Sequence, residues 1–138
     1  MFASDGVWDP AFGAHQNAGR KTTWQVGVSV VPEEVPSGFV VAASVADSTS
    51  MVTNWGSNGV EYINTDITLT LARVPVGREI GLTAVDRVSA DGIAVGTATV
   101  FDRHGRLGTS VTTAISNAKR AVDFTVHDFS EDPRHSGA

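Results

Sequence analysis

The chain contains no cysteine, and this absence excludes disulfide bonds, thiolate nucleophiles and cysteine-bound zinc. It also has no cluster of Lys and Arg and carries a net charge of −5, so we expect no nucleic-acid partner. No apolar run approaches the ~18 residues that a membrane span requires. These absences point to a soluble globular protein, which we expect in the cytoplasm.

The composition that remains supports a folded core. Hydrophobic residues make up 41% of the 138 residues and charged residues make up 18%, a balance typical of one globular domain. We expect residues 1–21 to form an irregular leader and residues 22–117 to form the folded domain. Residues 118–138 are expected to be a partly disordered C-terminal extension, with the disorder concentrated in residues 132–138.

A single helix is predicted over residues 36–56. Pro36 and Ser37 are typical of a helix start, and Gly56 is typical of a helix end. Residues 39–46 are apolar except for one serine, and a helix that is apolar all round must be buried all round. Asp47 follows this run directly. A charge in such a place is costly unless it has partners or a purpose, so Asp47 is the first candidate site residue.

The rest of the chain alternates apolar and polar residues with the period of β-strands. Strands are predicted over residues 23–31, 60–73, 78–88, 93–101 and 107–115, and a hairpin turn is predicted at residues 91–92. In the second of these strands, Asn64 is expected on the face opposite to Ile67 and Leu69. In the last strand, residues 107, 109, 111, 113 and 115 are expected to share one face.

The order of strand, helix and four further strands joined by short turns predicts an α+β fold. The apolar face of the sheet must be covered, and the apolar helix must be surrounded by other parts of the chain. We therefore expect a single domain in which an antiparallel sheet of five or six strands wraps around one long central helix. Ala94, Gly96 and Ala98 alternate along one strand, and their small size predicts a close approach of the helix.

This arrangement resembles the hot-dog fold, and shorter motifs extend the resemblance. The motifs are Val45-Ala46-Asp47, residues 63–68, Arg73 and Pro75-Val76-Gly77. In this order they resemble the C-terminal half of acyl-CoA thioesterase II proteins, which carry two hot-dog halves in one chain. The likeness covers residues 23–117, and it implies a hydrolase that cleaves an acyl thioester with water.

The resemblance implies a catalytic set of three residues. An Asp on the central helix corresponds to Asp47, a small polar residue on the next strand corresponds to Asn64, and a Gln on the last strand corresponds to Thr112. Together such residues would hold the attacking water. Thr112 departs from the family pattern, because a hydroxyl is shorter than a carboxamide and cannot reach as far.

The resemblance also implies a partner, because the chain has the length of one hot-dog half. We expect either a homodimer or pairing with a second hot-dog half. The expected substrate is acyl-CoA or another acyl thioester, and no metal or redox cofactor is expected, since coenzyme A is part of the substrate. The alternative is a non-catalytic half that binds an acyl chain or serves as a partner subunit, and a truncated gene product is a third reading.

Several residues keep two interpretations. Asp47 is either the base that activates water or a structural carboxylate bonded to neighbouring hydroxyls. Arg73 either meets an acidic or phosphate group of coenzyme A or is solvated at the end of its strand. The four histidines, at positions 15, 104, 127 and 135, lie in predicted loops or the tail without the spacing of a metal pair.

Overall fold

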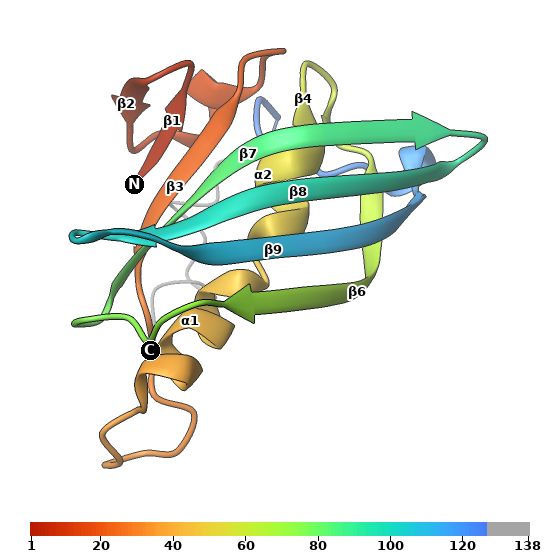
Figure 1. Ribbon diagram of the computed structural model, residues 1–138. Helices are drawn as coiled ribbons and strands as arrows, with labels where there is room; N and C mark the ends of the chain where they lie inside the picture. The colour runs from red at the N-terminus through yellow and green to blue at the C-terminus, as the bar shows by residue number, and fades with distance from the viewer. Residues whose placement is uncertain (127–138) are drawn as a thin grey trace.

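The computed structural model describes residues 1–126, so the disorder predicted for residues 132–138 lies outside the described part. Its main feature is a seven-stranded antiparallel sheet in the order β2-β1-β3-β7-β8-β9-β6 (Figure 1). The strands are β1 (Phe2–Ser4), β2 (Val7–Asp9), β3 (Lys21–Val26), β6 (Tyr62–Leu71), β7 (Glu79–Ala90), β8 (Ile93–Asp102) and β9 (Gly105–Ser116). Two short strands, β4 (Trp55–Gly56) and β5 (Gly59–Val60), form a separate ribbon.

The strand count exceeds the predicted five or six because residues 1–21 are not an irregular leader. They contain β1, β2 and the 3₁₀ helix η1 (Phe12–His15). Asp5 and Gly6 have positive φ angles of 48° and 82° and form the tight turn between β1 and β2. Phe2 and Phe12 then pack on Trp55, with ring centroids 5.8 and 6.0 Å away. This aromatic packing orders a segment whose Gly-rich composition predicts a loop.

The predicted helix is present but interrupted. Its parts are α1 (Gly38–Ala46) and α2 (Thr49–Asn54), and Asp47 and Ser48 form the joint between them. The predicted start is confirmed, because the Val40 N–H donates to the Ser37 side chain over 3.2 Å. Within residues 1–126, no helix is long and apolar enough to cross a membrane.

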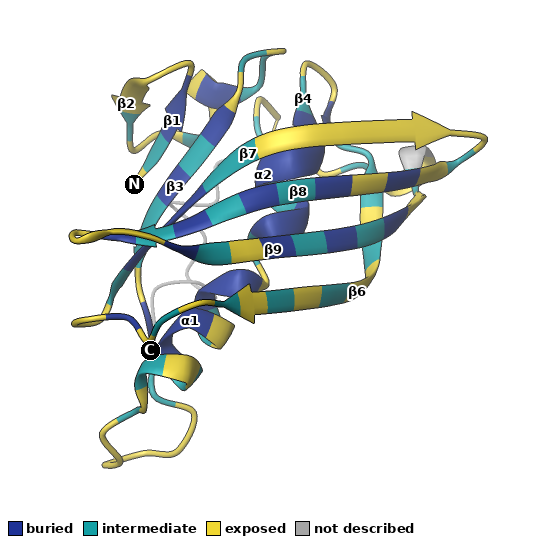
Figure 2. Cartoon of the chain, in the orientation of Figure 1, coloured by how far each residue is buried: buried dark blue, intermediate teal, exposed yellow. Residues whose placement is uncertain are grey.

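The sheet curls over α2, whereas α1 extends beyond its edge (Figures 1 and 2). The prediction that the apolar helix is buried all round is therefore wrong for α1. Val41 and Val45 are buried against the sheet, but Ala43 is exposed and Phe39 is 58% exposed. The surface of α1 that faces away from the sheet has no cover within the described chain.

The inner face of the sheet is lined with small side chains, as predicted for β8. Ala94, Gly96 and Ala98 are buried, and a side chain at Gly96 would meet Thr53 of α2. These small residues allow α2 to lie close to the sheet. The hydrophobic core next to them consists of Val41, Val45, Val52, Ile80, Leu82, Ala98, Val100 and Leu107. The result is the helix-wrapping sheet of a hot-dog fold.

The face predicted for β9 is confirmed for residues 109, 111, 113 and 115, which share one face, and is wrong for Leu107. Leu107 is buried, but Thr109 and Ile115 are exposed, and Ser110 and Thr112 are fully buried. A register shift between β8 and β9 near Leu107 explains the change, because one extra residue moves every later side chain to the other face. The inner face of β9 is consequently polar as well as small.

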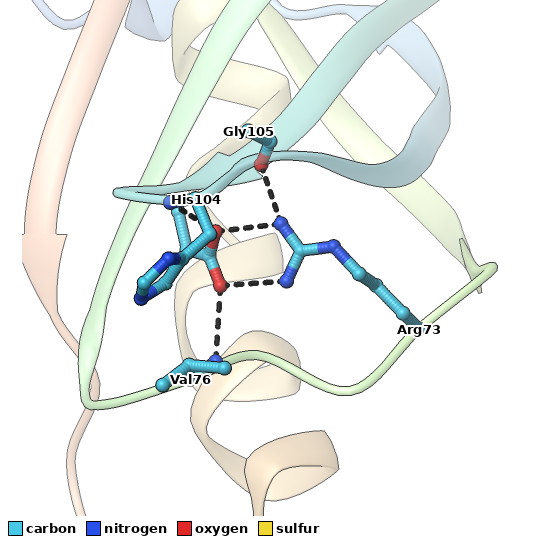
Figure 3. A network of polar contacts seen from close by, with 5 residues as sticks. Arg73, Val76, His104 and Gly105 are labelled. Atoms are coloured by element: carbon cyan, nitrogen blue, oxygen red, sulfur yellow. Dashed lines mark hydrogen bonds and ion pairs between the residues drawn. The ribbon is translucent and has the colours of Figure 1, made fainter.

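Asp102 ties the two turns at one end of the sheet together through its partners Arg73, Val76 and His104, which Figure 3 labels. Its side chain is fully buried and accepts hydrogen bonds from the two terminal nitrogens of the Arg73 guanidinium, at 2.9 and 2.7 Å. It also accepts the backbone N–H groups of Val76 at 3.0 Å and His104 at 2.8 Å. The hydrogen-bonded Arg73 guanidinium holds the pKa of this carboxyl well below its usual range. The prediction that Arg73 is simply solvated is wrong, because the guanidinium is hydrogen-bonded to Asp102 and to the Gly105 carbonyl.

We expect Asp102→Asn to lower the free energy of unfolding by about 2 kcal/mol near neutral pH, because charge-assisted hydrogen bonds are lost. A carboxyl with a lowered folded pKa stabilises the protein above its unfolded pKa, and this stability is lost as the pH falls. The difference between the two proteins should therefore shrink below about pH 4. Urea denaturation across a pH series tests this, and a difference that stays constant down to about pH 3 would contradict it.

Candidate functional site

Asp47 lies at the joint between α1 and α2, where its backbone N–H bonds to the Val45 carbonyl. The side chain is exposed, so the prediction of a desolvated carboxylate is wrong for the single chain. The physical reason is the uncovered outer surface of α1. The predicted structural role, in which hydroxyls of neighbouring residues bind the carboxylate, also finds no hydrogen bond among the described residues.

An open pocket of about 360 Å³ lies beside Asp47, between α1 and the edge strand β6. Its lining residues are Phe39, Ala43, Ala46, Asp47, Ile67 and Leu69. Five of the six are apolar, so Asp47 supplies the only charge in the lining. The arrangement places one carboxylate at the rim of an apolar groove, where it could hold a water molecule next to an apolar ligand.

A β-bulge brings Asn64 to the inner face of the sheet. Asn64 pairs with Ala114 and Asp66 pairs with Thr113, so Thr65 is an extra residue on β6. Directly paired residues point to the same face, and Ala114 is buried beneath the helix. Asn64 therefore shares the inner face with Ile67, and not the outer face that plain alternation predicts.

Thr112 lies on the same inner face, directly opposite Ile67. It is fully buried, and its hydroxyl donates to the backbone carbonyl of Asp66 over 3.2 Å. The Asp66 carbonyl lies next to the bulge in β6, so the Thr112 hydroxyl already has a partner within the protein. The structure thus places Asn64 and Thr112 on the adjoining strands β6 and β9, and Ile67, which is opposite Thr112, lines the same pocket as Asp47. Within residues 1–126, no hydrogen bond joins any two of Asp47, Asn64 and Thr112.

A second set of hydroxyls, which the sequence analysis missed, fixes α2 to the sheet. Thr49 and Ser110 are fully buried, and their hydroxyl oxygens lie 2.6 Å apart. The Thr49 hydroxyl also donates to the Ala46 carbonyl over 2.6 Å. Because that bond uses its proton, Ser110 must donate to Thr49. The buried positions of β9 follow a period of two, but the bulges hid which of its two faces is the inner one.

Ser48, the second residue of the joint, is hydrogen-bonded to another strand of the sheet, β3. The Gln25 amide donates to the Ser48 hydroxyl over 2.9 Å. The two residues that follow Asp47 are therefore both fixed to the sheet, Ser48 by its bond to β3 and Thr49 by its bond to β9. The backbone at Asp47 is thereby held in position although its side chain is exposed.

Among the described residues, no group of three or more His, Asp and Glu side chains is placed to hold a metal ion. His15, which is buried, bonds to the Ser4 hydroxyl and the Asp9 carbonyl, so it holds β1, β2 and η1 together.

Comparison with known protein families gives a match. The sequence model of the acyl-CoA thioesterase C-terminal domain matches residues 6–115. The matched span runs from the turn after β1 into β9 and includes Asp47, Asn64 and Thr112. None of the curated proteins matches the chain, and none of the solved structures matches it.

The bond between Thr49 and Ser110 can be tested by a double-mutant cycle. Thr49→Val leaves the Ser110 hydroxyl buried without an acceptor and should cost about 2 kcal/mol of unfolding free energy. Replacing both partners with apolar groups removes the unpaired donor. We therefore expect Thr49→Val with Ser110→Ala to cost about 1 kcal/mol less than the sum of the single changes. Strict additivity in urea denaturation would contradict the inferred bond.

Proposed function

Because the chain belongs to the family of acyl-CoA thioesterase C-terminal domains, we propose that it hydrolyses an acyl-CoA thioester with a water molecule held by Asp47. The observation that carries this proposal is the position of Asp47. Asp47 is the one carboxylate in the lining of the apolar groove. It lies at a joint that is held in place by the hydrogen bonds of Ser48 to β3 and of Thr49 to β9. The groove would receive the acyl part of the substrate.

In the proposed reaction the water oxygen attacks the thioester carbonyl carbon while Asp47 takes up a proton from the water. The carbon–sulfur bond then breaks, and the coenzyme A sulfur leaves as a thiolate, which takes the proton held by Asp47 and becomes the thiol. The products are a carboxylic acid and coenzyme A. The proposal needs no resident metal or redox cofactor, because coenzyme A is itself part of the substrate.

Asn64 and Thr112 support this site in different ways. The bulge gives the Asn64 amide a place on the inner face, where it could orient the water or the substrate. The Thr112 hydroxyl is already bonded to the Asp66 carbonyl, so we assign it to positioning the bulge and not to holding the water. A bonded hydroxyl in the place of the family Gln is also the observation that favours the second candidate function, a non-catalytic acyl-binding or partner subunit.

The groove is open because β6 is the last strand of the sheet. β6 is ten residues long and pairs only with β9 among the described strands. Its other edge and the exposed Phe39 of α1 flank the same groove. We propose that a second hot-dog half, either another copy of this chain or a separate protein, pairs along β6. Such a partner would cover the groove and exclude bulk water from Asp47. A cytoplasmic location remains part of this proposal.

The catalytic role of Asp47 predicts a specific loss of activity. Asp47→Asn should lower the rate of thiol release from acyl-CoA by a factor on the order of a hundred, because the general base is lost. Its melting temperature should stay unchanged, since the side chain is exposed and makes no hydrogen bond that the structure describes. Asp91→Asn, an equal charge change in an exposed hairpin turn, is the control. Equal rates in wild type and Asp47→Asn would exclude the proposed role.

The proposed pairing surface predicts a change in assembly. Phe39→Lys places a charge in the groove beside β6 and should weaken self-association at least tenfold, because the ammonium loses water on pairing. Analytical ultracentrifugation over a concentration series measures this change. Val126→Lys, an exposed apolar residue outside the groove, serves as the matched control. A wild-type chain that stays monomeric throughout would exclude the homodimer and leave a separate second half as the partner.

A further inference from the structure

A second cavity, a cleft of about 540 Å³, lies at the C-terminal end of α2. Its walls include Asn54 and Trp55 at the end of the helix, Tyr62 at the start of β6 and Arg87 of β7. None of its lining residues belongs to the Asp47 groove. The cleft is therefore a separate feature, and nothing in the proposed hydrolysis uses it.

A β-bulge in β7 directs Arg87 toward this cleft. Ala84 pairs with Ala98 and Asp86 pairs with Thr97, so Val85 is an extra residue on β7. Arg87 consequently pairs with Gly96, which lies on the inner face beneath α2. Without the extra residue, Arg87 would point to the outer face of the sheet.

Neutral groups hold the Arg87 guanidinium in place. Its Nε donates to the Asn54 side-chain oxygen over 2.9 Å, and one terminal nitrogen lies 3.3 Å from the Ser89 hydroxyl. Its central carbon lies 4.8 Å from the centre of the Tyr62 ring. Neither ion pair found among residues 1–126 involves Arg87. The guanidinium is thus oriented by its neighbours while its positive charge is not neutralised.

The other charged groups of the cleft are mostly bound elsewhere. The Lys21 ammonium is bonded to three oxygens of Asn17 and Gly19, and burial lowers its pKa. Asp86 accepts from the Arg87 backbone N–H and, by register, points to the outer face of β7. The remaining charged residues of the lining are Asp5, which accepts from the Arg20 backbone N–H, together with Arg20 and Glu61.

Trp55, another lining residue of the cleft, carries an unsatisfied donor. The residue is 4% exposed, and its indole N–H is buried without a hydrogen-bond partner in the described structure. An unpaired buried donor is costly, and an acceptor from a ligand would remove that cost. The cleft therefore combines an unneutralised guanidinium with a residue that carries an unsatisfied N–H.

We propose that this cleft binds an anionic oxygen group, a phosphate or a carboxylate, through the Arg87 guanidinium. A planar guanidinium can donate two parallel hydrogen bonds to either group, which a Lys ammonium cannot do. If the protein acts on acyl-CoA, the anion is either a phosphate of coenzyme A or a carboxylate at the far end of the acyl chain. The binding itself does not depend on the proposed hydrolysis.

The test is a set of titrations of the full chain with inorganic phosphate, coenzyme A and the dicarboxylate suberate at low ionic strength. Calorimetry gives each Kd, and the indole N–H signal of Trp55 in an NMR spectrum reports binding at the cleft. We expect Arg87→Gln to weaken binding at least tenfold, and Arg87→Lys to weaken it less. Arg106→Gln, the same charge change at an exposed position outside the cleft, should leave the Kd unchanged.

The outcomes separate the sources and the two proposals. An Arg87-dependent loss for coenzyme A identifies a phosphate, and such a loss for suberate identifies a carboxylate. Absence of binding for all three probes would overturn the proposal, as would an equal effect of Arg87→Gln and Arg106→Gln. Asp47→Asn should bind the probes like wild type, because Asp47 lies outside the cleft. Loss of hydrolysis and loss of anion binding are therefore measured independently.

Discussion

The close approach of α2 to the sheet is the constraint on which the rest of the structure depends. It requires small side chains on β8 and β9, and at Gly96 any side chain would meet Thr53. Protein interiors are packed densely, so a helix seated this closely has no freedom to slide along the sheet. The hydroxyl contact between Thr49 and Ser110 follows from that seating, and it fixes the joint that carries Asp47. The opposite, C-terminal end of α2 presents Asn54 to Arg87.

Polar groups reach the inner face where strands depart from regular alternation. The extra residue Thr65 in β6 places Asn64 beneath the helix, and the extra residue Val85 in β7 does the same for Arg87. Bulges are frequent next to functional sites because they redirect a side chain without changing the strand order. The bulge in β7 thus supplies Arg87 to the cleft at the C-terminal end of α2, whereas Asn64 lies on the inner face outside the lining of either cavity.

The sequence predicts the broad architecture because the strongest patterns are local. Alternation predicts the long strands, Ser37 predicts the helix start, and the row from Ala94 to Ala98 predicts close packing. The faces of Asn64, Arg87 and Thr112 are not predictable in this way, because one inserted residue reverses the alternation and leaves no compositional trace. The exposure of Asp47 escapes prediction for another reason. An apolar helix indicates that a cover is needed, but it does not show whether the same chain provides it.

The two cavities differ in how complete they are within one chain. The cleft at Arg87 is formed by five segments of a single fold, and its guanidinium is already oriented. The groove at Asp47 is bounded by an unpaired strand edge and leaves its carboxylate in water, where electrostatic effects on a reacting group are weak. A thioesterase gains most from a carboxylate when water is excluded around it. On these grounds we propose that anion binding needs one chain only, whereas the proposed hydrolysis also needs the proposed pairing along β6.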